Sequence, residues 1–122
     1  MPDFVPDNAA VWFEIPVSDY DRARNFYGAV LTNTLQDRRD GPNPTAVFVA
    51  KDQSAVAGHV YPGQPAPSGT GITIHLSVDN LEEGLERVKK SGGTVVSPII
   101  TIPAGRFAYC VDPDGNSFGL FN

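Results

Sequence analysis

The chain consists of two halves with the same order of sequence features, and this repeat constrains its fold more than any other property. The first half contains IPVSDYDRARNFYGAV from Ile15, and the second contains LSVDNLEEGLERVKKS from Leu76. Aligning Val17 with Val78 gives an offset of 61 residues, half of the 122-residue chain. Few residues are identical, so the order of elements carries the argument. The repeat predicts two copies of one structural module.

Each half follows the same plan of one strand, one helix and three further strands. Alternating apolar and mixed residues predict half-buried strands over 10–17 and 72–78. Apolar residues at helical spacing follow each of them. Three short strands are then expected in each half, over 33–38, 45–50 and 55–61 and over 94–97, 106–111 and 117–121. The fold class is therefore α+β, with two consecutive copies of a βαβββ module.

The expected helices have recognisable ends. Ser18 or Asp19 can cap the first helix, and Asp79 with Glu82 resembles a capping box before the second. Gly92-Gly93 ends the second helix. The apolar stripes are Ala23, Phe26, Tyr27, Val30 and Leu31 in the first helix and Leu81, Leu85 and Val88 in the second.

The length allows a single domain over residues 1–122. Module 1 spans about 9–61, a linker rich in proline and glycine spans 62–71, and module 2 spans about 72–122, with a loop over 98–105. The net charge of −5 and the scattered Lys and Arg residues argue against nucleic acid as a partner. No apolar run approaches the roughly 20 residues of a membrane span.

The cellular location is expected to be cytoplasmic. The start, MPDFVPDN, has neither the basic residues nor the apolar run of a signal peptide. Cys110 is the only cysteine and cannot form an internal disulfide. The strand pattern turns Cys110 towards the core, so we interpret it as a small buried residue.

The module plan and three strings resemble the vicinal oxygen chelate superfamily, which includes glyoxalase I, bleomycin-resistance proteins and extradiol dioxygenases. The strings are FEIPVSDYDRARNFYGAV, LSVDNLEEGLERVKKSGG and DPDGNSFGL. The first strand, WFEIPV, looks most like the small bacterial glyoxalase-like members. The resemblance implies one cupped mixed sheet around a cavity, with the helices on its convex side, and a homodimer.

The same resemblance implies a divalent metal held at four symmetric positions. In this sequence those positions are Trp12, Thr73, Gly58 and Gly119. Tryptophan and glycine side chains offer no ligand, and a lone threonine is a poor one. We therefore expect no metal cofactor and no glyoxalase I activity on the usual plan.

Strand alternation predicts which residues line the cavity. Phe13, Ile15 and Val17 share one face of the first strand, and Ile72, Ile74, Leu76 and Val78 share one face of the fifth. These apolar faces must meet the helices. The opposite faces then line the cavity and carry Trp12, Glu14, Pro16, Thr73, His75 and Ser77.

Glu14 and His75 occupy equivalent positions of the repeat and are the candidate catalytic residues. As an acid and a base they can catalyse proton transfer, and they can also orient a ligand. The alternative is that Glu14 pairs with His75 or Arg106 only to satisfy buried polarity. The repeat aligns His59 with the core residue Leu120, but a bulge can turn it into the cavity. Glu14, His59 and His75 would then form an alternative site for Fe, Mn, Ni or Zn.

Aromatic residues complete the expected cavity. Phe48, Tyr109 and Phe121 join Trp12 and Thr73 as candidate ligand-binding residues, and Gly58 and Gly119 would leave space beside them. This assignment places Val47, Val49, Ala108, Cys110, Phe118 and Leu120 in the core.

Two functions are compatible with this cavity. The first is a metal-free protein that binds a small aromatic or amphipathic molecule, as the resistance-type relatives do. The alternative is an enzyme of lyase, isomerase or dioxygenase type that uses Glu14 and His75, with or without a divalent metal. The missing metal ligands favour binding.

Overall fold

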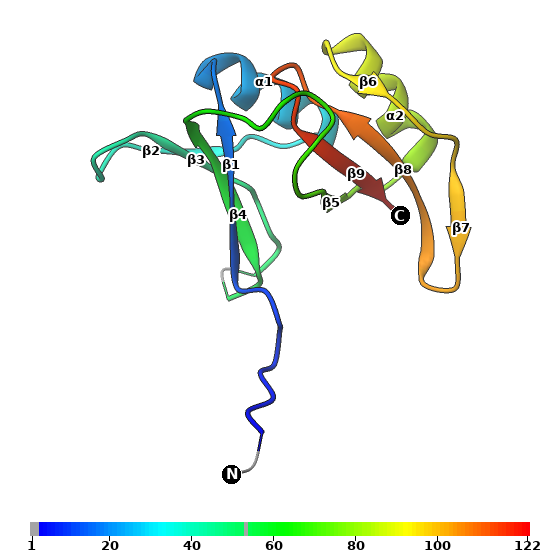
Figure 1. Cartoon of the computed structure of the whole chain (residues 1–122), viewed down its shortest axis with the longest axis horizontal. Coiled ribbons are helices and arrows are strands. Elements are labelled where there is room, and N and C mark those ends of the chain that lie inside the picture. The colour runs from blue at the N-terminus through cyan, green and yellow to red at the C-terminus, as the bar shows by residue number, and fades with distance from the viewer. Residues whose placement is uncertain (1–2, 53) are drawn as a thin grey trace.

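The chain folds into two consecutive βαβββ modules, as the repeat predicts. A computed structural model describes residues 3–52 and 54–122. Module 1 contains β1 (Trp12–Val17), α1 (Tyr20–Leu31), β2 (Gln36–Arg38), β3 (Thr45–Val47) and β4 (Ala57–Pro62). Module 2 contains β5 (Ile74–Ser77), α2 (Leu81–Lys90), β6 (Thr94–Val95), β7 (Ile100–Ile102), β8 (Gly105–Val111) and β9 (Ser117–Phe121). Figure 1 shows these elements in chain order.

The strands are divided between two sheets of the same topology. In module 1 the order is β1-β4-β3-β2, and in module 2 it is β5-β9-β8-β6, with β7 paired to β8. Each first strand runs parallel to the last strand of its own module, and the other pairs are antiparallel. The strands of each module therefore pair only with strands of the same module. The single cupped sheet expected from the sequence is replaced by two mixed sheets.

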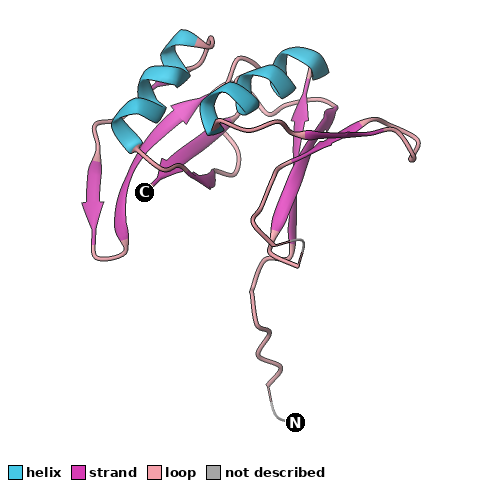
Figure 2. Ribbon diagram, turned by 180° about the vertical axis from the view of Figure 1, so that it is seen from behind, coloured by secondary structure: helices cyan, strands magenta, loops and turns pink. Residues whose placement is uncertain are grey.

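The two helices lie side by side on one side of both sheets (Figure 2). The core fills the space between this helical layer and the sheets. Alternation along β1 and β5 is as predicted, with Ile15, Val17, Leu76 and Val78 buried. Ile72 is an exception, because β5 begins only at Ile74 and leaves Ile72 exposed. Cys110 is buried in the core as predicted, and burial raises the pKa of its thiol to about 11.

The helix starts agree with the sequence in one case and differ in the other. Asp19 caps α1, and its carboxylate accepts a hydrogen bond from the Arg22 amide at 3.1 Å. The cap of α2 is Asn80, which accepts a hydrogen bond from the Glu83 amide, so the capping box of Asp79 and Glu82 is wrong. Glu82 instead forms a bidentate ion pair with Arg106.

The loop predicted over 98–105 contains the strand β7. Its backbone pairs with β8, from Ile100 opposite Phe107 to Ile102 opposite Gly105. The two strands form a hairpin that extends beyond the rest of the sheet in Figure 1. The alternation Ile-Thr-Ile over 100–102 is a strand pattern, which the flanking prolines concealed.

The turn between β8 and β9 connects the two modules. The Tyr27 hydroxyl of α1 donates a 2.6 Å hydrogen bond to the buried Asp112 carboxylate. The Asp114 carboxylate accepts hydrogen bonds from the Ser18 amide and hydroxyl at the start of α1. Arg22 adds an ion pair to Asp114 at 3.0 Å. The DPDGN segment therefore docks on module 1 as well as making a turn. In the described chain, no helix has the length and apolar character needed to cross a membrane.

Candidate functional site

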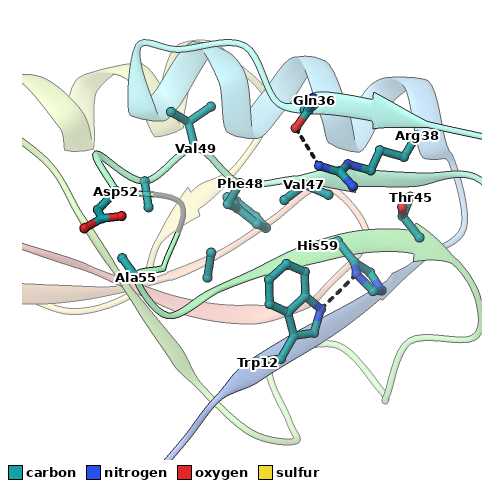
Figure 3. A pocket seen from close by; sticks show the side chains of 12 residues that line it. Trp12, Gln36, Arg38, Thr45, Val47, Phe48, Val49, Asp52, Ala55 and His59 are labelled. Carbon is teal, nitrogen blue, oxygen red and sulfur yellow. Dashed lines mark hydrogen bonds between the residues drawn. The ribbon is translucent and has the colours of Figure 1, made fainter. Parts of the chain in front are cut away.

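A pocket lies on the module 1 sheet, beside the strand face opposite the core. Its volume is about 490 Å³, within the usual range for small-molecule sites. Figure 3 shows side chains from the β1, β2, β3 and β4 strands and from the segment after β3 around one hollow. The lining residues are Trp12, Gln36, Arg38, Thr45, Val47, Phe48, Val49, Ala50, Asp52, Ala55, Ala57 and His59.

Trp12 forms one wall of the pocket, and its indole is held by a hydrogen bond. The indole Nε1–H donates to His59 Nδ1 at 3.0 Å (Figure 3). The two side chains lie on neighbouring strands, because β1 and β4 run parallel and place Glu14 opposite His59. Trp12 is 47% exposed, so its ring can contact a ligand without being part of the core.

Glu14 supports this arrangement from the far side of His59. Its Oε1 atom lies 3.3 Å from His59 Nε2. The side chain of His59 is 14% exposed and that of Glu14 is 64% exposed, so the carboxylate faces solvent. His59 Nδ1 accepts the indole hydrogen bond, and Nε2 lies on the side of Glu14. His59 therefore positions the indole from the neighbouring strand.

The pocket has polar groups of opposite charge at its two ends. Arg38 lies at one end, where its Nη2 donates to Gln36 Oε1 at 3.3 Å. Asp52 lies at the other end in Figure 3, and its carboxylate accepts a 3.0 Å hydrogen bond from the Ser54 amide. This backbone hydrogen bond holds the pKa of Asp52 below its usual range, so Asp52 is ionised at neutral pH. Apolar side chains line the hollow between these ends.

The residues expected to share one cavity are divided between the modules. Trp12 and Phe48 border the pocket, whereas Glu14 lies behind His59. His75 belongs to the second sheet, where its ring contacts Phe107, Tyr109 and Phe121 at centroid distances of 5.1, 5.8 and 6.5 Å. Thr73 lies in that module too, hydrogen-bonded to Ser117. Glu14 and His75 occupy equivalent register positions, but each has its own neighbours.

The assignment of Val47 and Val49 to the core is wrong, because both border the pocket and Val49 is exposed. Ala46 and Phe48 are the buried residues of this segment, and Phe48 also borders the pocket. Phe48 packs on Phe13 and Tyr27 at centroid distances of 5.4 and 5.3 Å. Its amide also bonds to the Gly58 carbonyl, which fixes this register.

The two glycines do not open space for a ligand. A Cβ atom on Gly58 would overlap the ring and carbonyl oxygen of Phe13, so the absent side chain accommodates the core. A Cβ atom on Gly119 would overlap the His75 imidazole. Gly119 is the register equivalent of His59, because these two residues lie opposite His75 and Glu14. His59 therefore lies on the Glu14 face, and the expected alignment with Leu120 is wrong.

The side chains present do not fit a metal ion. Within 3–52 and 54–122, no three His, Cys, Asp or Glu side chains cluster closely enough to hold one. Glu14 and His59 meet, but His75 is not with them. The hydrogen bond from Trp12 also occupies the second nitrogen of His59. We therefore derive no step through a metal.

Sequence reasoning missed several polar residues of the pocket. Gln36, Arg38 and Thr45 come from β2 and β3, which are three residues each and too short to show a reliable alternation. Asp52 comes from the turn after β3. The available signal was the alternation of Gln36 and Arg38, which places both side chains on one face of their strand.

Comparisons with known proteins agree with this architecture. A glyoxylase-like domain-containing protein of Didymella fabae is 28% identical over 116 residues, covering 88% of each chain. CFP32 of Mycobacterium bovis, a glyoxylase by name, is 25% identical over 115 residues. These cover 90% of this chain, which spans 44% of that protein.

A solved structure shows the same fold. The crystal structure of a glyoxalase/bleomycin resistance protein from Albidiferax ferrireducens T118 superposes with a TM-score of 0.67. It is 19% identical, and the match covers 93% of this chain and 98% of that one. The sequence model of the Glyoxalase/Bleomycin resistance protein/Dioxygenase superfamily matches residues 9–120. The chain therefore belongs to this superfamily.

Proposed function

We propose that this protein binds a small planar molecule in the module 1 pocket, in the manner of a bleomycin-resistance-type binding protein and without a metal. One observation carries the proposal: a hollow of about 490 Å³ is walled by an indole that His59 holds in place. A fixed aromatic wall loses little conformational freedom on binding, which favours affinity. The lining is apolar between its two polar ends, as in most small-molecule sites.

The arrangement of Glu14 favours binding over catalysis. A general base must reach the proton that it removes, and Glu14 is separated from the pocket by His59. His59 Nδ1 accepts the hydrogen bond from Trp12, and Nε2 lies 3.3 Å from Glu14 Oε1. The pocket nitrogen of His59 is thus engaged by Trp12 and Glu14 does not line the pocket, which favours binding over catalysis.

Binding of 2-naphthamide, a flat neutral molecule, tests this function. Isothermal titration calorimetry would compare the unaltered protein with Trp12→Ala and with Tyr109→Ala. Trp12→Ala should weaken binding by about 1–3 kcal/mol, because the ring contact is lost. Tyr109 is a matched control, since it is a partly exposed aromatic residue of the second sheet outside the pocket.

The expected result is loss of affinity in Trp12→Ala alone, with both variants still folded by circular dichroism. Equal losses in the two variants, or a loss confined to Tyr109→Ala, would place the ligand elsewhere. Failure of every flat ligand to bind the unaltered protein would refute the function.

We also propose that the protein is a cytoplasmic homodimer. Its only cysteine is buried and unpaired, which suits a reducing compartment. Val49, Val96, Ile102 and Tyr109 are exposed apolar residues on the described surface, and a second copy would cover part of them. Light scattering should give twice the 13.1 kDa of one chain, and the mass of a single chain at micromolar concentration would contradict the dimer.

A further inference from the structure

The charge at the Arg38 end of the pocket indicates which ligands it accepts. A guanidinium carries five N–H donors in a planar fork that matches a carboxylate. Arg38 uses one hydrogen bond, to the neutral Gln36 amide, at the long distance of 3.3 Å. None of the ion pairs in the described part of the chain includes Arg38. Its charge therefore faces the pocket without a carboxylate partner.

The neighbouring arginine shows the contrasting arrangement. Arg39 Nε lies 3.2 Å from Asp37 Oδ2, and its guanidinium lies over the Tyr20 ring at 5.4 Å. Arg39 does not line the pocket. Alternation along the chain sends these adjacent residues to opposite sides, so one arginine is neutralised and the other borders the hollow.

The position of Asp52 favours one orientation of the ligand in the pocket. Arg38 and Asp52 lie at opposite ends of the hollow in Figure 3. An anionic group would be attracted to Arg38 and repelled by Asp52. Both charges therefore favour a ligand whose anionic group lies at the Arg38 end. The apolar middle, with Trp12, Val47 and Val49, would contact the rings. Thr45, also at the pocket, adds a hydroxyl donor for the anion.

We propose that the pocket selects a planar aromatic carboxylate, held with its carboxylate on Arg38 and its ring against Trp12. This inference rests on the proposed binding function and adds the chemical class of the ligand. The protein as a whole has a net charge of −5, so its general field does not attract anions. A preference for an anion must therefore come from the local contact.

The test compares 2-naphthoate with 2-naphthamide, which has the same rings and no charge. Calorimetry would be run on the unaltered protein, on Arg38→Gln and on Arg39→Gln. The unaltered protein should bind naphthoate about tenfold more tightly than naphthamide, because charge-assisted hydrogen bonds are stronger than neutral ones. Arg38→Gln should remove this preference, so that naphthoate binds no more tightly than naphthamide. Arg39→Gln changes the net charge equally and should keep the preference.

Each outcome separates this inference from the function on which it rests. Equal affinities of the two ligands in the unaltered protein, or a preference that survives Arg38→Gln, would overturn the anion selectivity while leaving the binding function intact. Equal loss of preference in Arg38→Gln and Arg39→Gln would also overturn it, because the effect would then come from net charge. If neither ligand binds, the binding function fails and the inference fails with it.

Discussion

Replacing Tyr27 by phenylalanine removes one hydrogen bond between the two modules. Tyr27 lies in α1 and is fully buried, and its hydroxyl donates to Asp112 Oδ2 at 2.6 Å. Asp112 lies between β8 and β9 and is only 4% exposed. Its other oxygen accepts hydrogen bonds from the Asp114 and Asn116 amides. The substitution therefore takes one donor from a buried carboxylate that also orders the turn.

The size of the effect follows from this geometry. A hydrogen bond to a charged group contributes about 1.5–3 kcal/mol. Asn116 Nδ2 also contacts Asp112 Oδ2, at 3.1 Å, and would remain as a donor, so the upper end of that range does not apply. We expect Tyr27→Phe to reduce the free energy of unfolding by about 2 kcal/mol, which corresponds to a fall in Tm of about 5–10 °C.

The same substitution should change the response to alkali. Burial, with the adjacent Asp112 carboxylate, raises the pKa of Tyr27 well above its usual value of 10.0. A raised folded-state pKa gives stability that is fully present below the unfolded pKa of 10.0 and is lost as the pH rises through the folded value. Tyr27→Phe should flatten the loss of stability above pH 10, since phenylalanine does not ionise.

Urea unfolding at neutral and alkaline pH measures both effects. Tyr61→Phe is the control, because Tyr61 is half-buried and its hydroxyl has no hydrogen-bond partner among the described residues. The control should change stability by less than about 0.5 kcal/mol. A change this small in Tyr27→Phe, or an unchanged alkaline slope, would refute the role given to the hydroxyl.

Three further results are expected. Gly58→Ala should destabilise the fold by about 1–3 kcal/mol in thermal unfolding, because its methyl group would overlap Phe13; an unchanged Tm would contradict this. Hydrogen bonds from Arg106 lower the pKa of Glu82 to about 2, so its stabilising effect should be present above its usual value of 4.5 and be lost as the pH falls towards 2. Carboxyl NMR of Arg106→Gln should show Glu82 titrating nearer 4.5, and an unmoved titration would count against the ion pair. Cys110 should react with a thiol reagent only after unfolding; rapid labelling of the native protein would argue against its burial.

The elements with long periodic patterns were predictable from the sequence. α1 buries Ala23, Phe26, Tyr27 and Val30, four members of its predicted stripe. The burial of Ile15 follows from alternation in β1, which has six residues. In these segments many apolar side chains indicate the same buried face, so a single exception does not change the interpretation.

The pocket was less predictable because its strands are short. β3 has only three residues, and its face was inferred by extending the repeat from the first strand. The two modules differ in length after their helices, so that extension shifted the register by one residue. A shift of one residue exchanges the two faces of a strand, which explains why Val47 was assigned to the core.

A one-residue shift in the opposite direction explains the interpretation of His59. Its alignment with Leu120 predicted a core position, whereas the backbone ladder places it opposite Glu14. The contact between Trp12 and His59 joins residues 47 positions apart, and only the ladder brings them together. Predicting this contact would require the strand pairing as well as the strands themselves.

The location of the ligand site in module 1 can be tested by mapping 2-naphthoate on the ¹⁵N-labelled protein by NMR. The chain has one tryptophan, so a single indole N–H signal reports on the pocket wall. Titration should shift that signal together with the backbone amides of Val47, Val49 and Ala57, which line the pocket. Shifts confined to His75 and Tyr109, with the indole signal unchanged, would contradict the account.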